Sequence, residues 1–132
     1  MYKGHCLCGS VKWEFDVAIE SVTACNCTAC RRYGVLWAYG HEEIDVRVIG
    51  TTKFYTRREN SALEFHFCEN CGCLVSWRAT KLNEKYQRRM AVNVRLIDDH
   101  QKILNLPIDH FDGFDTFEDL PRDERCVKHM WF

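Results

Sequence analysis

Three cysteines within six residues, in the segment CNCTAC that begins at Cys25, constrain this chain more than any other feature. A disulfide between Cys25 and Cys27, or between Cys27 and Cys30, would close a very small and strained ring. A divalent cation that prefers sulfur relieves the crowding, because thiolates that converge on one point become its ligands. Zinc is the cation that this pattern favours, since it tolerates all-sulfur tetrahedral sites. Three local ligands leave the fourth position unassigned, and the occupant of that position decides what the protein does.

Two further pairs of cysteines have the spacing of metal ligands. Cys6 and Cys8 are flanked by glycines, and Cys68 and Cys71 form a CxxC-Gly knuckle after an alternating segment. Glycine permits the tight turns that let both sulfurs of a pair face one ion. We therefore expect these four thiolates to hold a structural zinc in a closed site whose binding energy contributes to folding. The alternative is four buried free thiols, because cysteine is also a small core residue.

Of the two cysteines that remain, Cys73 bears on the function. Cys126 stands alone among charged residues and indicates no site. Cys73 follows the knuckle directly, so it either completes a second closed site with the three clustered cysteines or packs beneath the knuckle. We favour packing, because Cys73 begins the strand that leaves a knuckle already committed to the other zinc. The central zinc then keeps an open position, which is typical of a catalytic site.

The chain has the length and composition of one compact domain, residues 1–132, and 46% of its residues are hydrophobic. Alternating segments bounded by turn residues predict an all-β, mainly antiparallel fold, and no long helical period appears. The strands we expect lie at 11–15, 35–39, 44–49, 53–57, 63–67, 74–77 and 90–96. We also expect a loop at 81–89, a helical turn at 97–102, and one or two short strands in the remainder.

Charge and hydropathy exclude several partners. The formal net charge is -1 with both signs interspersed, which argues against a nucleic-acid surface. No apolar run approaches the roughly 18 residues of a membrane span, and the N-terminus lacks a signal-peptide core. We therefore expect a cytoplasmic protein with no membrane contact. Its nine cysteines are clustered in a way that indicates metal binding and not a disulfide framework. No feature indicates an oligomeric state.

The cysteine segments also resemble a known family. The segments that do so, in order, are Gly4-x-Cys6-x-Cys8-Gly9, Cys25-x-Cys27-x-x-Cys30-Arg31 and Phe67-Cys68-x-x-Cys71-Gly72. They resemble the glutathione-dependent formaldehyde-activating family, which also includes centromere protein V. The resemblance continues through 37–38, 89–93 and 98–99, to about 110–113. Cys73 stands where these enzymes commonly have a small polar residue.

This resemblance implies a β-tent of antiparallel sheets around zinc, with up to two zinc ions per chain. It implies that Cys6, Cys8, Cys68 and Cys71 hold structural zinc, and that Cys25, Cys27 and Cys30 hold a catalytic ion. The implied activity joins formaldehyde and glutathione to give S-hydroxymethylglutathione, formally as a carbon-sulfur lyase. The alternative function is a non-catalytic, zinc-stabilised binding module in which both zinc sites are structural.

The implied chemistry agrees with the residues around the clustered cysteines. Zinc with three thiolates is suited to exchange its fourth ligand for another thiolate, which lowers the pKa of that thiol. A small-molecule thiol and an aldehyde are therefore the partners that we expect. Glutathione has two carboxylates, and Arg31 and Arg32 suit bidentate recognition of a carboxylate, unless they are merely solvated.

Four other residues have two readings each. Trp37 and Tyr39 either wall a pocket beside the central cysteines or belong to the core. His66 and His110 are either proton carriers near the metal or histidines with ordinary partners.

Overall fold

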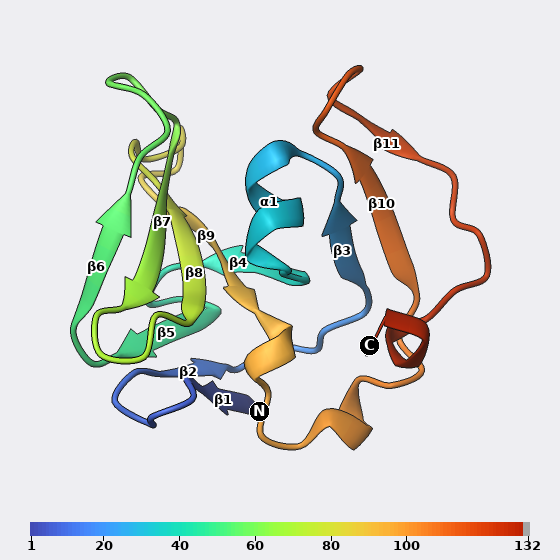
Figure 1. Ribbon diagram of the computed structural model, residues 1–132, viewed down its shortest axis with the longest axis horizontal. Coiled ribbons are helices and arrows are strands. Elements are labelled where there is room, and N and C mark those ends of the chain that lie inside the picture. Colours follow the sequence, from blue (N-terminus) through green and yellow to red (C-terminus); the bar gives the residue numbers. More distant parts are fainter. Residues whose placement is uncertain (131–132) are drawn as a thin grey trace.

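The structure is a computed structural model that describes residues 1–130, and it is mostly β (Figure 1). The strands are β1 (Tyr2–His5), β2 (Lys12–Phe15), β3 (Val22–Cys25), β4 (Trp37–His41), β5 (Val46–Ile49), β6 (Thr52–Tyr55), β7 (Leu63–Cys68), β8 (Leu74–Ala79), β9 (Arg89–Asn93), β10 (Ile108–Asp112) and β11 (Glu118–Leu120). The helix α1 covers Thr28–Tyr33, and 3-10 turns lie at Val94–Leu96, His100–Lys102 and Val127–Met130. The prediction of a β fold is confirmed.

The strands form two sheets. A three-stranded sheet has the order β1-β2-β5, and an eight-stranded sheet has the order β11-β10-β3-β4-β9-β8-β7-β6. Neighbouring strands are antiparallel except β3 and β10, which run parallel with Val22 opposite Ile108. This parallel pair makes the large sheet mixed, and it brings the C-terminal part of the chain beside the first cysteine of the CNCTAC segment.

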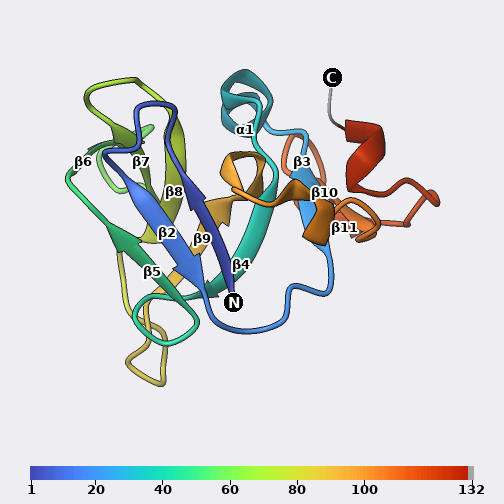
Figure 2. The ribbon, with the colours of Figure 1, turned by 90° about the horizontal axis from the view of Figure 1, so that it is seen from below.

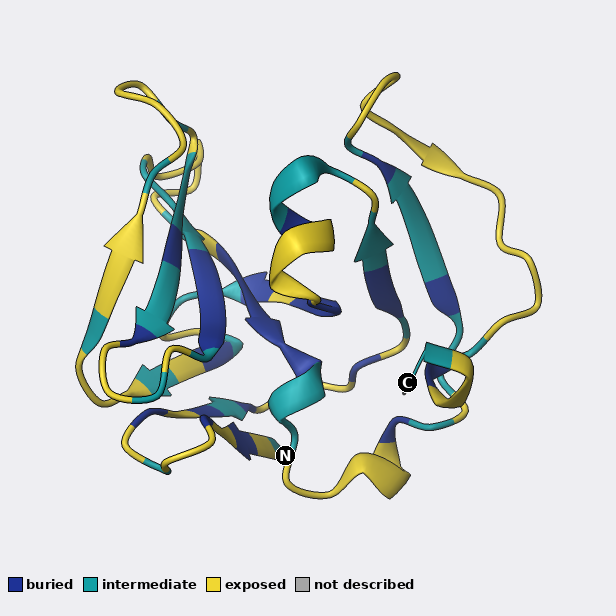
Figure 3. Ribbon diagram, viewed as in Figure 1, coloured by how far each residue is buried: buried dark blue, intermediate teal, exposed yellow. Residues whose placement is uncertain are grey.

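The large sheet is buried on both faces in its centre. One face packs against the small sheet, and this core contains Trp13, Phe15, Val22, Leu36, Ala38, Val46, Met90 and Val92. Figure 2 shows the small sheet stacked on one side of the large one. The opposite face carries Trp37, Trp77 and Ala91, which form a second core beneath α1 with Cys30. Successive residues of a strand point to opposite faces, so Met90 and Ala91 enter different cores. Figure 3 shows that β8 and β9, in the middle of the large sheet, are mostly buried.

Two predicted strand boundaries were wrong for local reasons. The strand expected at 90–96 ends at Asn93, because the Asn93 side chain accepts a hydrogen bond from the Arg95 N–H at 3.2 Å and caps a 3-10 turn. The strand expected at 44–49 begins only at Val46, because Asp45 turns back and accepts a hydrogen bond from the His41 N–H at 2.8 Å. In both cases a short polar side chain competes with the sheet for a backbone donor.

Candidate metal centre and adjoining pockets

Two turns bring the first group of cysteines together. Cys6 and Cys8 lie in the turn between β1 and β2, and Cys68 and Cys71 lie where β7 turns into β8. Gly9 and Gly72 follow the second cysteine of each pair, with φ of 79° and 78°, a backbone conformation that favours glycine. We call Cys6, Cys8, Cys68 and Cys71 the closed cluster.

The spacing of these sulfurs fits one tetrahedral ion. All four Sγ atoms lie within 4.8 Å of one another, with 3.6 Å between Cys6 and Cys8 and 3.7 Å between Cys8 and Cys68. Four thiolates around zinc at about 2.3 Å would be separated by about 3.8 Å. The Ser10 hydroxyl lies 3.1 Å from the Cys8 Sγ and, as the largest cause, lowers the pKa of Cys8 to about 5. The closed cluster can hold a metal ion.

The second group forms at the start of α1. Cys25 ends β3, Cys27 is the N-cap of α1, and Cys30 lies in the first turn of the helix. The Cys30 N–H donates to the Cys27 Sγ at 3.3 Å, and the Cys27 N–H donates to the Cys25 Sγ at 3.5 Å. The local fold therefore gathers the three sulfurs to within 4.8 Å of one another. We call Cys25, Cys27 and Cys30 the central cluster, and it too can hold a metal ion.

At the central cluster, the surroundings of Cys25 favour its ionised form, the thiolate. A hydrogen bond from Cys30 is the largest cause that lowers the pKa of Cys25 to about 6. The pKa of Cys30 is raised because it shares that proton and because it is buried, and the Trp37 Nε1–H, 3.2 Å from the Cys30 Sγ, opposes the rise. Cys25 thus ionises near neutral pH while Cys30 keeps its proton, and a bound cation would displace that proton. Trp37 is core, and its indole N–H also contacts the site.

Three residues that the sequence analysis did not single out hold the loop beside the central cluster. The Asp112 carboxylate accepts hydrogen bonds from the N–H groups of Phe114, Asp115 and Thr116 at 3.1–3.2 Å. Asn26 donates to Asp112 at 3.1 Å and accepts from the Phe114 N–H at 3.0 Å. Gly113 lies against the thiols: a Cβ at this position would be 2.7 Å from the Cys25 Sγ. The Asp-Gly pair is a common turn signal, but its contact with Cys25 depends on the parallel pairing of β3 and β10.

Cys73 lies beside the closed cluster. Its Sγ accepts a hydrogen bond from the Leu7 N–H at 3.4 Å, and its pKa is raised first by burial and then by its hydrogen bond to Cys71. Among residues 1–130, the cysteines of the central cluster have no fourth cysteine, histidine or carboxylate within ligand distance.

A pocket of about 570 Å³ opens between α1 and β6, next to the central cluster. Its wall contains Thr28 and Ala29, which lie between Cys27 and Cys30, together with Arg32, Tyr33, Tyr55 and Arg57. Arg32 donates to the Thr28 carbonyl at 3.2 Å, and Arg57 donates to the Thr28 hydroxyl. We call this space the arginine pocket. Of the two arginines proposed from the sequence, Arg32 lines it and Arg31 lies outside it on the exposed helix surface. Arg57 was missed because it follows β6, about 25 residues after the clustered cysteines in the sequence.

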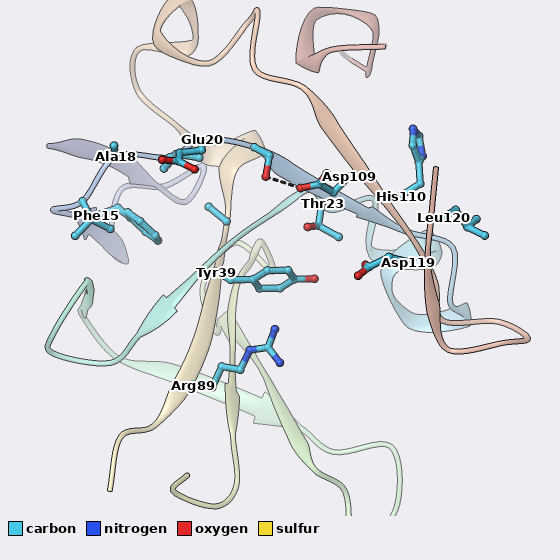
Figure 4. Close-up of a pocket in the computed structure, with 14 residues that line it drawn as sticks. Phe15, Ala18, Glu20, Thr23, Tyr39, Arg89, Asp109, His110, Asp119 and Leu120 are labelled. Atoms are coloured by element: carbon cyan, nitrogen blue, oxygen red, sulfur yellow. Dashed lines mark hydrogen bonds between the residues drawn. The ribbon is translucent and has the colours of Figure 1, made fainter. Parts of the chain in front are cut away.

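A second pocket, of about 590 Å³, lies over the sheet where β3, β4, β10 and β11 meet (Figure 4). Tyr39 and Arg89 line it from one side, and Thr23 and Asp119 from the other. The Arg89 guanidinium carbon is 5.1 Å from the ring centre of Tyr39 and 5.9 Å from that of Trp77. We call this space the sheet pocket. Of the two alternatives that the sequence left for Tyr39, a pocket wall or a core position, the structure shows the pocket wall.

The sheet pocket and the central cluster share the strand β3. Thr23 lines the pocket and Cys25 lies two residues further along β3, so their side chains are on the same face of the sheet. Burial raises the pKa of Tyr39 to about 12, a hydrogen bond with Thr23 opposes the rise, and the charges of Cys25 and Cys30 add to it. The Tyr39 phenol therefore stays protonated at neutral pH.

The two candidate histidines have other partners. His66 lies 2.8 Å from the Thr52 hydroxyl and 3.0 Å from a Glu64 carboxylate oxygen. His110 lines the sheet pocket and pairs with Asp123 at 3.0 Å. Neither histidine is a member of a potential metal-binding group in the described part of the chain.

Comparison with known protein families identifies the chain. Residues 1–109 match the family described as glutathione-dependent formaldehyde-activating enzyme. The chain belongs to this family. The resemblance inferred from the three cysteine segments is therefore confirmed, and the matched residues include both the closed and the central cluster. The loop that begins at Gly113 lies beyond them.

One solved structure of similar fold is the crystal structure of a Rhodobacter sphaeroides protein. It shares 25% sequence identity with this member of the formaldehyde-activating family, with a TM-score of 0.57. The similarity covers 73% of this chain and 87% of the other. A search of curated proteins found no match. No helix in residues 1–130 is long and apolar enough to cross a membrane, and a cytoplasmic location stays a prediction.

Proposed function

We propose that this protein is a zinc-dependent enzyme of carbon-sulfur bond chemistry that joins the thiol of glutathione to an aldehyde, as in S-hydroxymethylglutathione synthesis. Membership of the formaldehyde-activating family supports both the thiol and the aldehyde class. The observation on which the proposal depends is the central cluster, where three thiols converge and no fourth ligand lies near them among the described residues. An incomplete set of protein ligands is the mark of a catalytic zinc site.

In this proposal the two clusters have different roles. Cys6, Cys8, Cys68 and Cys71 hold a structural zinc, because four thiolates complete a tetrahedron. Cys25, Cys27 and Cys30 hold the catalytic zinc. Cys73 stays outside both sets, since its sulfur accepts a hydrogen bond from the Leu7 N–H and belongs to neither group of converging sulfurs among the described residues. Zinc at the central cluster would supply a positive centre that lets a bound thiol ionise near neutral pH.

The chain itself supplies position and hydrogen bonds. The thiolate sulfur adds to the carbonyl carbon, so a carbon-sulfur bond forms and the electron pair of the carbonyl π bond moves to oxygen. That oxygen takes up a proton, and the thiol has lost one, so glutathione and aldehyde combine with no other reactant. The Tyr39 hydroxyl is the proposed donor to the oxygen, because Tyr39 lines the sheet pocket and its phenol is protonated at neutral pH. Arg32 and Arg57 offer guanidinium groups to a glutathione carboxylate.

Rates of adduct formation test this function. Formaldehyde and glutathione combine spontaneously, so the assay follows their exchange by NMR with and without the zinc-loaded enzyme. Wild type should exceed the background, Cys27→Ser should fall to it, and Cys126→Ser should retain the wild-type rate. Cys126 is a suitable matched control because its sulfur lies 3.5 Å from His129, outside both clusters.

Zinc-edge spectroscopy tests the ligand count separately. With both sites loaded, four and three thiolates average 3.5 sulfurs per zinc, whereas two closed sites would average four. An average of four sulfurs, together with a wild-type rate equal to the background, would contradict the enzyme and favour the structural binding module.

A further inference from the structure

The two pockets beside the central cluster differ in charge. The lining of the arginine pocket contains Arg32 and Arg57 and no carboxylate. The lining of the sheet pocket contains one arginine, Arg89, together with the carboxylates of Glu20, Asp109 and Asp119. One pocket therefore suits an isolated anion, and the other suits a group with a negative and a positive charge side by side.

Arg89 is available to a ligand. Its guanidinium group rests on Tyr39 and Trp77, and within residues 1–130 it forms no ion pair. The preceding residue, Arg88, instead pairs with Glu42 at 3.2 Å and donates to the Ala79 carbonyl. Stacking on two rings fixes the direction of the Arg89 fork and lowers the entropy lost when it binds a carboxylate.

Of the carboxylates that line the sheet pocket, one has protein partners and two are available to a ligand. Asp109 is held by Arg122 at 2.6 Å and by the Ser21 hydroxyl, so its oxygens are occupied. Asp119 and Glu20 form no ion pair within the described part of the chain and are exposed. Because Asp119 and Arg89 face each other across the pocket, an ammonium and a carboxylate attached to one carbon can be bound together.

The two ends of glutathione differ in the charged groups that they carry. The γ-glutamyl end has an ammonium and a carboxylate on one carbon, and the glycyl end has a carboxylate alone. The thiol belongs to the middle residue, so both ends extend away from the sulfur in opposite directions. The arginine pocket takes one wall from α1 and the other from Tyr55, at the end of β6, and Arg57, whereas the sheet pocket takes its walls from β3, β4, the start of β9, β10 and β11. The central cluster, at the end of β3 and the start of α1, lies between β6 and β10 (Figure 1).

We infer that glutathione lies across the central cluster with its γ-glutamyl end in the sheet pocket and its glycyl carboxylate in the arginine pocket. Arg89 binds the γ-glutamyl α-carboxylate, and Asp119 binds the adjacent ammonium. Arg32 and Arg57 bind the glycyl carboxylate. This inference rests on the proposed function, which makes glutathione the thiol, and it assigns a direction to the bound peptide. An extended tripeptide spans about 10 Å, comparable with the diameter of a helix with its side chains, so one glutathione is long enough to pass from one side of α1 to the other.

Calorimetric binding of unreactive ligands tests the direction. The probes are S-methylglutathione, γ-glutamyl-S-methylcysteine amide, which lacks the glycyl end, and N-acetyl-S-methylcysteinylglycine, which lacks the γ-glutamyl end. Arg89→Gln should weaken the first two about tenfold and leave the third unchanged, whereas Arg57→Gln should weaken the first and third and leave the second unchanged. A tenfold change corresponds to about 1.4 kcal/mol, which is at the low end for a charge-assisted hydrogen bond because the site is open to solvent.

A control variant and three possible outcomes separate the proposed direction of the peptide from the proposed function. Arg58→Gln, which removes an exposed arginine that lines neither pocket, should change none of the three affinities. Melting and zinc content confirm that each variant is folded and loaded. If Arg89→Gln weakens all three probes equally, or weakens only the glycyl probe, the direction is wrong while glutathione binding stands. If wild type binds none of the probes, glutathione itself is wrong. If the crossed pattern appears without turnover, the direction holds and the enzyme proposal fails.

Discussion

Gly113→Ala should weaken metal binding at the central cluster alone. Gly113 belongs to the loop held by Asp112, and a Cβ there would lie 2.7 Å from the Cys25 Sγ and 2.9 Å from the Cys27 Cβ. Non-bonded heavy atoms prefer about 3.5–4.0 Å, so the loop or the sulfur must move by about 1 Å. The loop resists, because Asp112 accepts three backbone N–H groups and one from Asn26.

The expected loss of zinc affinity follows from how little the zinc-sulfur distances of a metal site can vary. Zinc-sulfur distances vary by about 0.2 Å in well-formed sites, so a shift of even half the required 1 Å exceeds this range. We expect the affinity of the central cluster for zinc to fall by about 10–100-fold, the range seen when groups that support metal ligands are changed. The folding cost of the overpacked contact should be about 1–3 kcal/mol. The closed cluster, built from other turns, should keep its zinc.

The assay is zinc release to a coloured chelator under reducing conditions. Wild type should release zinc in two phases, and Gly113→Ala should accelerate only the faster one. Gly34→Ala is the matched control: Gly34 ends α1 with φ of 66°, and a Cβ there would meet nothing within 4 Å. That variant should lose about 1 kcal/mol of stability to backbone strain without changing the release of zinc. Equal rates for Gly113→Ala and wild type in both phases would refute the steric argument.

Three further results are expected. Cys68→Ala should lower the free energy of unfolding by about 4 kcal/mol, which is the chain-entropy value for losing a cross-link between segments 60 residues apart. The variant should aggregate or melt at a lower temperature than wild type. The control Cys126→Ala should melt like wild type. Cys73→Ser should keep both zinc ions and the adduct-forming rate, so the loss of one zinc by metal analysis would make Cys73 a ligand. Asp112→Asn should destabilise the protein at neutral pH, because hydrogen bonds from the Thr116 N–H and then from Asn26 hold the pKa of Asp112 below its usual range. The stabilisation by the ionised Asp112 is complete above the unfolded pKa of about 3.9 and is lost as pH falls through the folded pKa. Urea unfolding should therefore show that the free energies of unfolding of Asp112→Asn and wild type become more similar below about pH 4.

The cysteine groups could be read from the sequence because their geometry is local. A CxC or CxxC followed by glycine specifies its own turn, so the juxtaposition within each pair needs no knowledge of the fold. The joining of Cys6 to Cys68 was inferred from the ligand number of zinc and not from any strand pattern. Most strands were also predictable, since alternation of apolar residues directly reflects a sheet with buried faces.

The surroundings of the central cluster depend on pairing, which alternation does not encode. Gly113 reaches Cys25 only because β10 joins β3 in parallel, with Phe111 opposite Cys25. Arg89 reaches the sheet pocket because β9 pairs with β4, with Arg89 opposite His41 and Ala91 opposite Tyr39. A period of two gives the face of each residue but not its neighbour on the next strand, so these contacts were out of reach.

The position of each cluster in the topology explains why one should stabilise the fold and the other should work on a substrate. The closed cluster joins the β1–β2 turn to the β7–β8 turn, across 60 residues of chain, so a metal there restricts the unfolded chain strongly. The central cluster spans only six residues, and a cross-link over so short a segment removes little chain entropy. Its binding energy is therefore not needed to hold distant elements together, and a ligand position there can exchange without unfolding the protein. If this reasoning is correct, Cys27→Ala should lose the central zinc and the adduct-forming rate. Its free energy of unfolding should fall only by the cost of one helix cap, about 1 kcal/mol. Global unfolding of Cys27→Ala, of the kind expected for Cys68→Ala, would show that the central cluster is a second structural site.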